Sequence, residues 1–131
     1  MINFLFRNAL VDFLRDECVT RVVAVPSLLR LICAVLAERG ETLPCMTIVV
    51  SSGEALSSET AVAVFSAMPN TRIVNLYGSS EIGADVTFNV LSQPSEVSDE
   101  ISIGSPLADA VCVVLDEAGK PVDDDVCGEL Y

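Results

Sequence analysis

Short runs of β-branched and aliphatic residues alternate with helical patterns in the first part of the chain, and this alternation restricts the possible folds most. The expected helices cover 3–16, 28–39 and 57–68, and the expected strands cover 21–25, 46–50 and 72–76. Ser27 stands where a residue could cap the second helix, and Gly40 stands where that helix should end. Short connections between helices and strands are typical of βαβ units. We therefore expect an α/β fold with a partial, mostly parallel sheet and flanking helices.

The C-terminal third of the chain has a different pattern. Residues 92–100 are polar and predict a linking loop at the surface. Beyond this loop, two short apolar runs flank the turn 116–121, which is rich in Asp, Gly and Pro and predicts a β-hairpin. We expect two units, a partial α/β subdomain over 1–91 and the start of a small antiparallel β subdomain over 101–131.

Charge and composition exclude several functions. The chain has 131 residues, 19 acidic and 7 basic side chains and a formal net charge of −12. Duplex nucleic acid and anionic membrane surfaces bind basic surfaces, so neither is an expected partner. The absence of histidine excludes Ser-His and Cys-His nucleophile pairs and His-ligated zinc. No apolar run is long enough to span a membrane, and we expect a cytoplasmic location.

The cysteine content predicts the state of the thiols, and the hydropathy predicts whether the chain is complete. The five cysteines have no Cys-x-x-Cys spacing, so we expect reduced thiols rather than disulfides or a metal site. Hydrophobic residues make up 51% of the chain, which is high for a soluble domain. We therefore expect that other parts of a larger protein cover some of its surface and that the chain is a fragment.

Two polar segments follow neighbouring expected strands, 51–55 after one and 77–81 after the next. The carboxyl ends of adjacent parallel strands meet at one edge of a sheet, where ligands of α/β proteins bind. Gly53 would let the backbone approach a flat ligand, and Tyr77 offers a ring face for stacking. Ser80 could donate to a phosphate oxygen, and Glu81 could bind Mg²⁺. The two segments therefore predict a nucleotide site.

The same residues allow a simpler interpretation. Ser51 and Glu54 have the spacing of a helix capping box, and 79–81 could start another helix. Short patterns of this kind recur by chance, so their spacing leaves both interpretations open.

Three sequence motifs in this chain resemble those of one known family. Residues 75–81, Asn-Leu-Tyr-Gly-Ser-Ser-Glu, resemble the Asn-x-Tyr-Gly-x-Thr/Ser-Glu motif of adenylate-forming enzymes, and 52–56 resemble their Gly-Glu-Ala-Leu loop. Residues 103–106 together with 113–116 and 128–131 are similar to the tail pattern of the adenylation domains of nonribosomal peptide synthetases. The resemblance implies a fragment of an adenylation domain from a peptide synthetase or a synthetase-like protein.

The resemblance also implies roles for matching positions. Tyr77 would stack on the adenine of ATP or AMP, and the residues around the nucleotide would be Gly53, Glu54, Asn75, Gly78 and Ser80. Ser80 would hold the α-phosphate and Glu81 would coordinate Mg²⁺, which makes these two the expected catalytic residues. The expected acid-substrate pocket consists of Val50, Ser52, Leu76, Ala84 and Asp85. Simpler roles are core packing for Val50 and Leu76 and a turn for Asp85.

The implied reaction joins ATP to a carboxylic acid, expected to be an amino acid, and gives acyl-AMP and pyrophosphate. A phosphopantetheine thiol on a carrier protein, or CoA, would then take the acyl group. The family's phosphate-binding lysine and its small C-terminal domain match nothing in this sequence, so the expected partners include the remainder of the domain, and the isolated chain should be inactive. The alternatives are an acyl-CoA synthetase fragment and a non-catalytic α/β interaction module.

Overall fold

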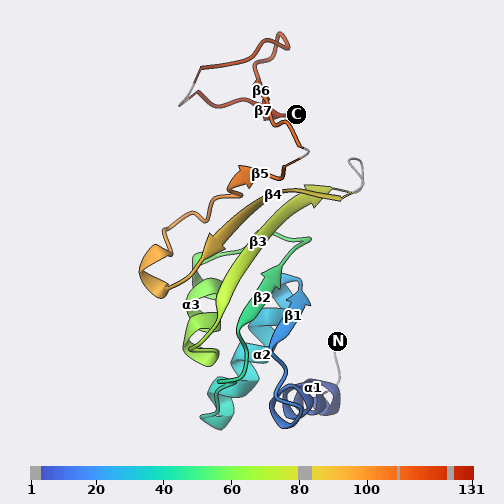
Figure 1. The fold of residues 1–131 in the computed structure, drawn as a ribbon, viewed down its shortest axis with the longest axis vertical. Coiled ribbons are helices and arrows are strands. Elements are labelled where there is room, and N and C mark those ends of the chain that lie inside the picture. The colour runs from blue at the N-terminus through green and yellow to red at the C-terminus, as the bar shows by residue number, and fades with distance from the viewer. Residues whose placement is uncertain (1–3, 80–83, 109, 124–125) are drawn as a thin grey trace.

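The computed structural model describes residues 4–79, 84–108, 110–123 and 126–131. The helices are α1 (Phe4–Asp16), α2 (Pro26–Arg39) and α3 (Ser58–Ala67), with the short 3-10 helix η1 (Pro94–Glu96). The strands are β1 (Arg21–Ala24), β2 (Ile48–Ser51), β3 (Arg72–Ser79), β4 (Ala84–Leu91), β5 (Ser105–Pro106), β6 (Val114–Leu115) and β7 (Glu129–Leu130). Figure 1 shows the strands of the main sheet running side by side, with α2 and α3 behind them.

The main sheet has five strands in the order β1-β2-β3-β4-β5. β1 pairs with β2 and β2 with β3 in parallel, so the expected βαβ units are present. β4 and β5 then extend the sheet in antiparallel orientation. The expected fold class, a partial α/β sheet with flanking helices followed by a small antiparallel sheet, is confirmed.

The ends of several elements differ from those the sequence predicts. Ser27 does not cap α2, because Val25 occupies the N-cap position and Pro26 opens the helix. Proline suits the first helical position because its missing N–H would have no partner there. Gly40 ends α2 in the left-handed conformation, as expected. β3 is longer than expected and includes Tyr77, because it pairs with β4 from Ile73 to Ser79.

The sequence interpretation missed β4 altogether. Its middle alternates polar and apolar residues from Asp85 to Val90, which is the pattern of a half-buried strand. Ser79 lies in β3 and does not start a helix, whereas Ser80 and Glu81, the rest of that predicted helix start, lie outside the described residues.

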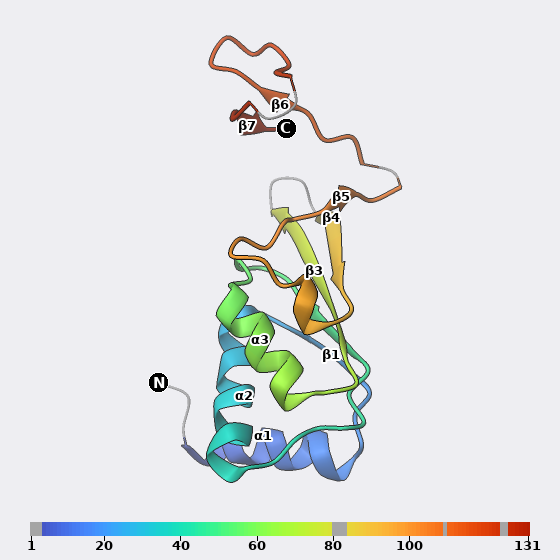
Figure 2. The same cartoon turned by 90° about the vertical axis from the view of Figure 1, so that its left-hand side faces the viewer.

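The chain after β4 passes back along the sheet before it reaches the small hairpin. The 92–100 segment contains η1 and is mostly exposed. β5 follows and belongs to the main sheet, although it lies within 101–131. β6 and β7 pair separately, beyond the end of the main sheet (Figure 2). The division into two units at residue 101 stays a prediction, and β5 joins the second predicted unit to the sheet of the first.

The core lies between the sheet and the helices. Val49, Ile73, Leu29, Leu36 and Val64 are all buried there. The opposite face of the sheet carries a row of valines at matched register positions, which are Val23, Val50, Val74 and Val90. Of these, Val23 is 67% exposed and Val90 is 40% exposed, so no described element covers the row.

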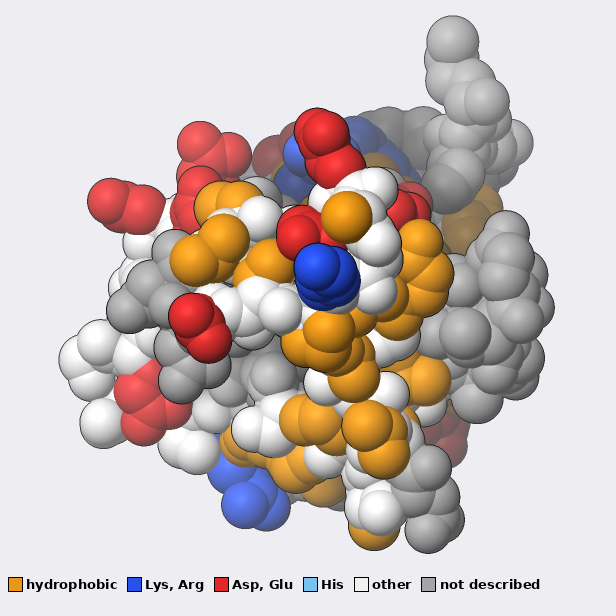
Figure 3. All heavy atoms as spheres, turned by 90° about the horizontal axis from the view of Figure 1, so that it is seen from above, with side chains coloured by type: hydrophobic (Ala, Val, Ile, Leu, Met, Phe, Trp, Pro, Cys, Tyr) orange, Lys and Arg blue, Asp and Glu red, His pale blue; other side chains and the backbone are white. Residues whose placement is uncertain are grey.

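Apolar side chains also lie at the surface near the small hairpin. Figure 3 shows hydrophobic side chains gathered at the surface in a view from that end of the molecule. Val111 and Tyr131 belong to this region and are 85% and 64% exposed. This exposure agrees with the unusually apolar composition.

The expectation of reduced cysteines is wrong for one pair. Cys18, just after α1, and Cys45, just before β2, form a disulfide with an S–S distance of 2.05 Å. The fold brings the two turns together across 27 residues of sequence, which spacing along the chain does not reveal. Cys33, Cys112 and Cys127 are free thiols. No described helix has the length and apolar character needed to cross a membrane, and the cytoplasmic location stays a prediction.

Candidate functional site

A pocket of about 330 Å³ opens at the carboxyl end of β3. One side is the loop after β2, another is the end of β3, and the third is the segment that leads into β5. The lining residues are Gly53, Glu54, Ala55, Leu56, Asn75, Leu76, Tyr77, Gly78, Ile101 and Ile103. The two motifs that predicted a nucleotide site therefore meet in one hollow.

Gly53 and Glu54 shape the loop side of this pocket. Gly53 has φ +88°, which glycine adopts without strain, and a Cβ there would lie 3.4 Å from Val25 Cγ1. The carboxylate of Glu54 accepts hydrogen bonds from the Ser27 backbone N–H at 3.0 Å and from the Ser27 hydroxyl at 2.9 Å. Glu54 thus binds the first turn of α2, where the helix dipole favours negative charge. The capping-box interpretation of Ser51 is wrong, because Ser51 lies inside β2 and Ser57 caps α3.

Asn75 and Tyr77 come from the strand side of the pocket. Asn75 is buried, and its Nδ2 donates to the carbonyl oxygen of Ser102 at 3.2 Å. Tyr77 is 40% exposed, so part of its ring is open to a ligand. Gly53 and Tyr77 thus line one hollow, in which a ring face is open for stacking and the polar residues Glu54 and Asn75 also take part.

The expected acid-pocket residues fall on or near the uncovered face of the sheet. Ser52 Oγ donates to Asp85 Oδ1 at 2.8 Å, so the fold brings this pair into contact. Val50 is a register partner of Val74 on the uncovered face, and Leu76 follows two positions along β3. Ala84 begins β4. These residues gather around the carboxyl ends of β2 and β3.

The expected catalytic residues, Ser80 and Glu81, lie outside the described residues. The part of the chain that the structure describes contains no group of three or more acidic or cysteine side chains that could hold a metal ion. A Mg²⁺ site built from protein ligands alone is therefore not found among those residues, and a site that uses Glu81 remains a prediction.

The sequence interpretation missed one wall of the pocket. Ile101 and Ile103 line it, although they lie in the segment expected to start a separate subdomain. Their alternation, Ile-Ser-Ile, is an extended pattern that places both side chains on one side. No local signal shows that this side faces the pocket, because the residues of β3 that line the same pocket lie far away along the chain.

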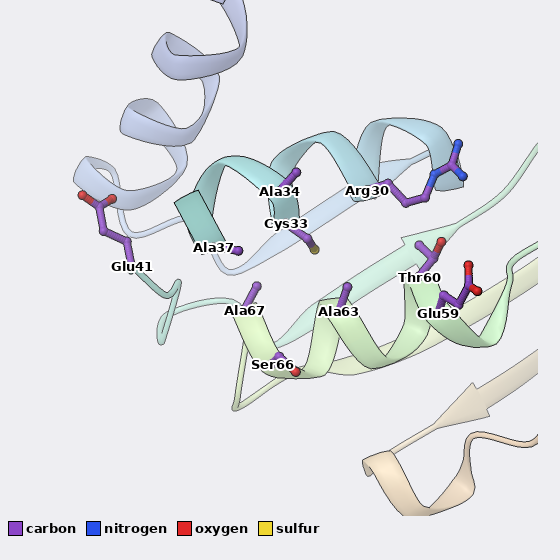
Figure 4. Close-up of a pocket in the computed structure, with 10 residues that line it drawn as sticks. All are labelled: Arg30, Cys33, Ala34, Ala37, Glu41, Glu59, Thr60, Ala63, Ser66 and Ala67. Atoms are coloured by element: carbon purple, nitrogen blue, oxygen red, sulfur yellow. The ribbon is translucent and has the colours of Figure 1, made fainter. Parts of the chain in front are cut away.

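A second hollow, of about 410 Å³, lies between α2 and α3. Figure 4 shows that small side chains such as Ala34, Ala37 and Ala63 line its middle, while Arg30 and Glu59 stand at one end. None of the predicted site residues is among those that line it. The candidate nucleotide site is therefore the pocket beside β3.

Comparison with known proteins decides the family. The family model described as AMP-binding enzyme matches residues 2–131. The chain belongs to the AMP-binding enzyme family. This AMP-binding chain is thus related to the adenylate-forming enzymes, as its motifs predicted.

Relatives of the AMP-binding chain include peptide synthetases. It is 35% identical over 132 residues to indigoidine synthase of Dickeya dadantii. It is 34% identical over 131 residues to the β-alanyl-bioamine nonribosomal peptide synthetase ebony of Drosophila melanogaster. These alignments cover 96% and 93% of the chain but only 9% and 15% of the two relatives.

A solved structure has the same fold. The crystal structure of IdnL1 is 33% identical, with a TM-score of 0.77, over 96% of this chain and 26% of that one. The AMP-binding chain therefore spans a minor part of the relatives and of the solved structure that it matches.

Proposed function

We propose that this chain supplies the adenine-binding part of an adenylation domain. The domain joins ATP to a carboxylic acid, forms acyl-AMP and releases pyrophosphate, and a phosphopantetheine or CoA thiol then takes the acyl group. The observation that carries the proposal is the pocket in which both nucleotide motifs meet. Membership of the AMP-binding family supports the use of ATP.

In this proposal the adenine ring lies between Gly53 and Tyr77. The exposed part of the Tyr77 ring stacks on the base, and Gly53 lines the pocket on the loop side. Glu54, Asn75 and Gly78 surround the rim of the base. The hydrogen bonds of Glu54 with Ser27 tie the loop to the start of α2 and so fix the loop side of the pocket.

The phosphates lie beyond the end of β3, next to Ser80 and Glu81. We assign the α-phosphate to the Ser80 hydroxyl and Mg²⁺ to the Glu81 carboxylate, which is a hard oxygen ligand suited to this ion. Bound Mg²⁺ screens the negative charge that builds up on the α-phosphate.

The acid substrate occupies the uncovered face of the sheet at the same edge. Val50 and Leu76 offer apolar contact, Ala84 stands at the start of β4, and Ser52 holds one oxygen of Asp85. The other Asp85 oxygen can pair with a substrate amine, which favours an amino acid. The name of the ebony relative refers to a β-alanyl group, which also carries an amine.

The chain acts within a longer cytoplasmic polypeptide in this proposal. The relatives are several times longer, and the uncovered valine row needs a partner element. The partners are the remainder of the adenylation domain and a carrier protein, and the isolated chain does not turn over substrate.

Substrate-dependent exchange of pyrophosphate into ATP, measured on the complete polypeptide that contains this chain, tests the proposal. Tyr77→Ala should raise the KM for ATP on the order of tenfold, because stacking on a base is worth about 1–3 kcal/mol. Tyr131→Ala is the matched control, since it removes the other tyrosine at a site away from the pocket.

Three results would change the assignment. Exchange driven by fatty or aryl acids but not by amino acids would identify an acyl-CoA synthetase. Activity that survives Glu81→Gln unchanged would remove the assigned Mg²⁺ ligand. A complete polypeptide without any exchange would favour an interaction module.

A further inference from the structure

The segment 101–104 forms one wall of the pocket, and side chains of β3 and β4 fasten it to the sheet. The carbonyl oxygen of Ser102 accepts two hydrogen bonds at 3.2 Å, from Asn75 Nδ2 and from Asn89 Nδ2. The Thr87 hydroxyl donates to the carbonyl oxygen of Ile103 at 2.8 Å. The wall is therefore held by side chains rather than by a continuous strand ladder.

The register of β3 and β4 explains why these side chains reach the same segment. Asn75 is the register partner of Asn89, and Tyr77 is the register partner of Thr87. Partners in register project to the same face of a sheet. Two pocket residues of β3, Asn75 and Tyr77, thus each have a neighbour on β4 that binds the pocket wall.

The Ser102 carbonyl also sets the orientation of the Asn75 amide. A carbonyl oxygen only accepts hydrogen bonds, so the nitrogen end of the Asn75 side chain must face it. Within the described residues, no group donates to Asn75 Oδ1. The oxygen end is therefore left as an acceptor at the pocket, because Asn75 lines it.

We propose that Asn89 and Thr87 are positioning residues of the adenine site: they hold 101–103 against the sheet, so that Ile101 and Ile103 close the pocket and the Asn75 amide oxygen faces the 6-amino group of the base. This inference rests on the proposed function. Neither Asn89 nor Thr87 lines the pocket itself. They act on the base indirectly, because they fix the position of 101–103 and, through it, the orientation of the Asn75 amide.

The choice of base follows from the chemistry of the Asn75 oxygen. An acceptor pairs with the amino group at position 6 of adenine and gains nothing from a purine without that group. A site with a firmly held Asn75 therefore prefers ATP to purine riboside triphosphate. Loosening the wall weakens that preference, whereas a general loss of stability does not.

The test measures kcat and KM for ATP and for purine riboside triphosphate in the complete polypeptide. Asn89→Ala should raise the KM for ATP roughly fivefold, which is the effect of one hydrogen bond, and leave kcat within about twofold. The preference for ATP over the analogue should fall toward that of Asn75→Ala. Thr87→Val keeps the shape of the side chain and should change the KM for ATP and the preference for ATP in the same direction. It therefore provides the test if Asn89→Ala fails to fold.

Two variants far from the pocket are matched controls. Asn70→Ala removes an Asn Nδ2 bond to the Pro44 carbonyl, and Thr47→Val removes a hydroxyl bond to the Thr20 carbonyl. Both should keep the wild-type preference for ATP. A wild-type polypeptide without ATP-dependent activity would overturn the proposed function. An active wild type whose preference is unchanged in Asn89→Ala and Thr87→Val would overturn the positioning role alone.

Discussion

The carboxylate of Glu54 is bound by Ser27 through two hydrogen bonds, one from the backbone N–H and one from the hydroxyl. The contact joins the loop after β2 to the first turn of α2, across 27 residues of sequence. It gives Glu54 a structural role at the edge of the pocket, whether or not a nucleotide is bound. The same residue thus links the stability of α2 to the shape of the candidate site.

Replacing Glu54 should destabilise the chain. Glu54→Ala removes a charge-assisted pair of hydrogen bonds at a helix N-terminus, and the expected loss is about 1 kcal/mol in the free energy of unfolding because both residues are exposed. Urea unfolding of Glu54→Ala, Ser27→Ala and the double variant measures the coupling between the two side chains. A coupling energy of zero would show that the contact contributes nothing.

Gly104 should tolerate no side chain. It has φ +83°, and a Cβ would overlap the carbonyl oxygen of Phe88 in β4. Gly104→Ala should cost about 3 kcal/mol or more, because backbone atoms must move as well as the φ angle. Gly119→Ala is the matched control, since Gly119 has φ +74° with no atom within 4 Å of a Cβ, and it should cost only about 1 kcal/mol. Equal losses in thermal unfolding would contradict the close approach of the two segments.

Removing the Ser51 hydroxyl should stabilise the fold. Ser51 Oγ is fully buried and has no hydrogen-bond partner in the described part of the chain. Ser51→Ala removes this unpaired group and should add about 1 kcal/mol, or roughly 2–4 °C in the melting temperature. Ser57→Ala is the contrasting control, because it removes the N-cap of α3 and should cost about 1 kcal/mol. A lower melting temperature for Ser51→Ala would mean that the hydroxyl has a partner.

Cys33 should react slowly with thiol reagents. Burial raises the pKa of the Cys33 thiol to about 11, so almost none of it is thiolate at pH 8. Iodoacetamide at pH 8 should therefore modify the exposed Cys127 first, and peptide mass mapping shows the order. Rapid labelling of Cys33 in the folded chain would contradict its burial.

The same pKa shift predicts how stability depends on pH. A thiol with a raised pKa in the folded state favours folding below its ordinary pKa near 9.0, and this contribution is lost as pH rises toward 11. Cys33→Ala should remove the part of the stability loss at alkaline pH that comes from this thiol. Unfolding curves between pH 8 and 11 measure the difference.

The local patterns predicted most of the fold because helices and buried strands have their own periodicities. The three helices, the three parallel strands and the closing hairpin were all expected, although several ends moved by a few residues. The ends depend on pairing: β3 extends through Tyr77 because β4 lies beside it. β4 itself had a recognisable alternation, so its omission was an error of interpretation.

The sequence alone determined the class of the fold, the family and the two motifs that meet at the pocket, because these depend on local residue patterns and short sequence motifs. Only the tertiary structure decided which distant groups touch. It joined Glu54 to Ser27, Cys18 to Cys45 and Ser52 to Asp85, and it laid Ile101 and Ile103 against the end of β3. Each of these pairings joins residues that lie far apart along the chain, and such pairing is set by how the layers pack rather than by any local propensity.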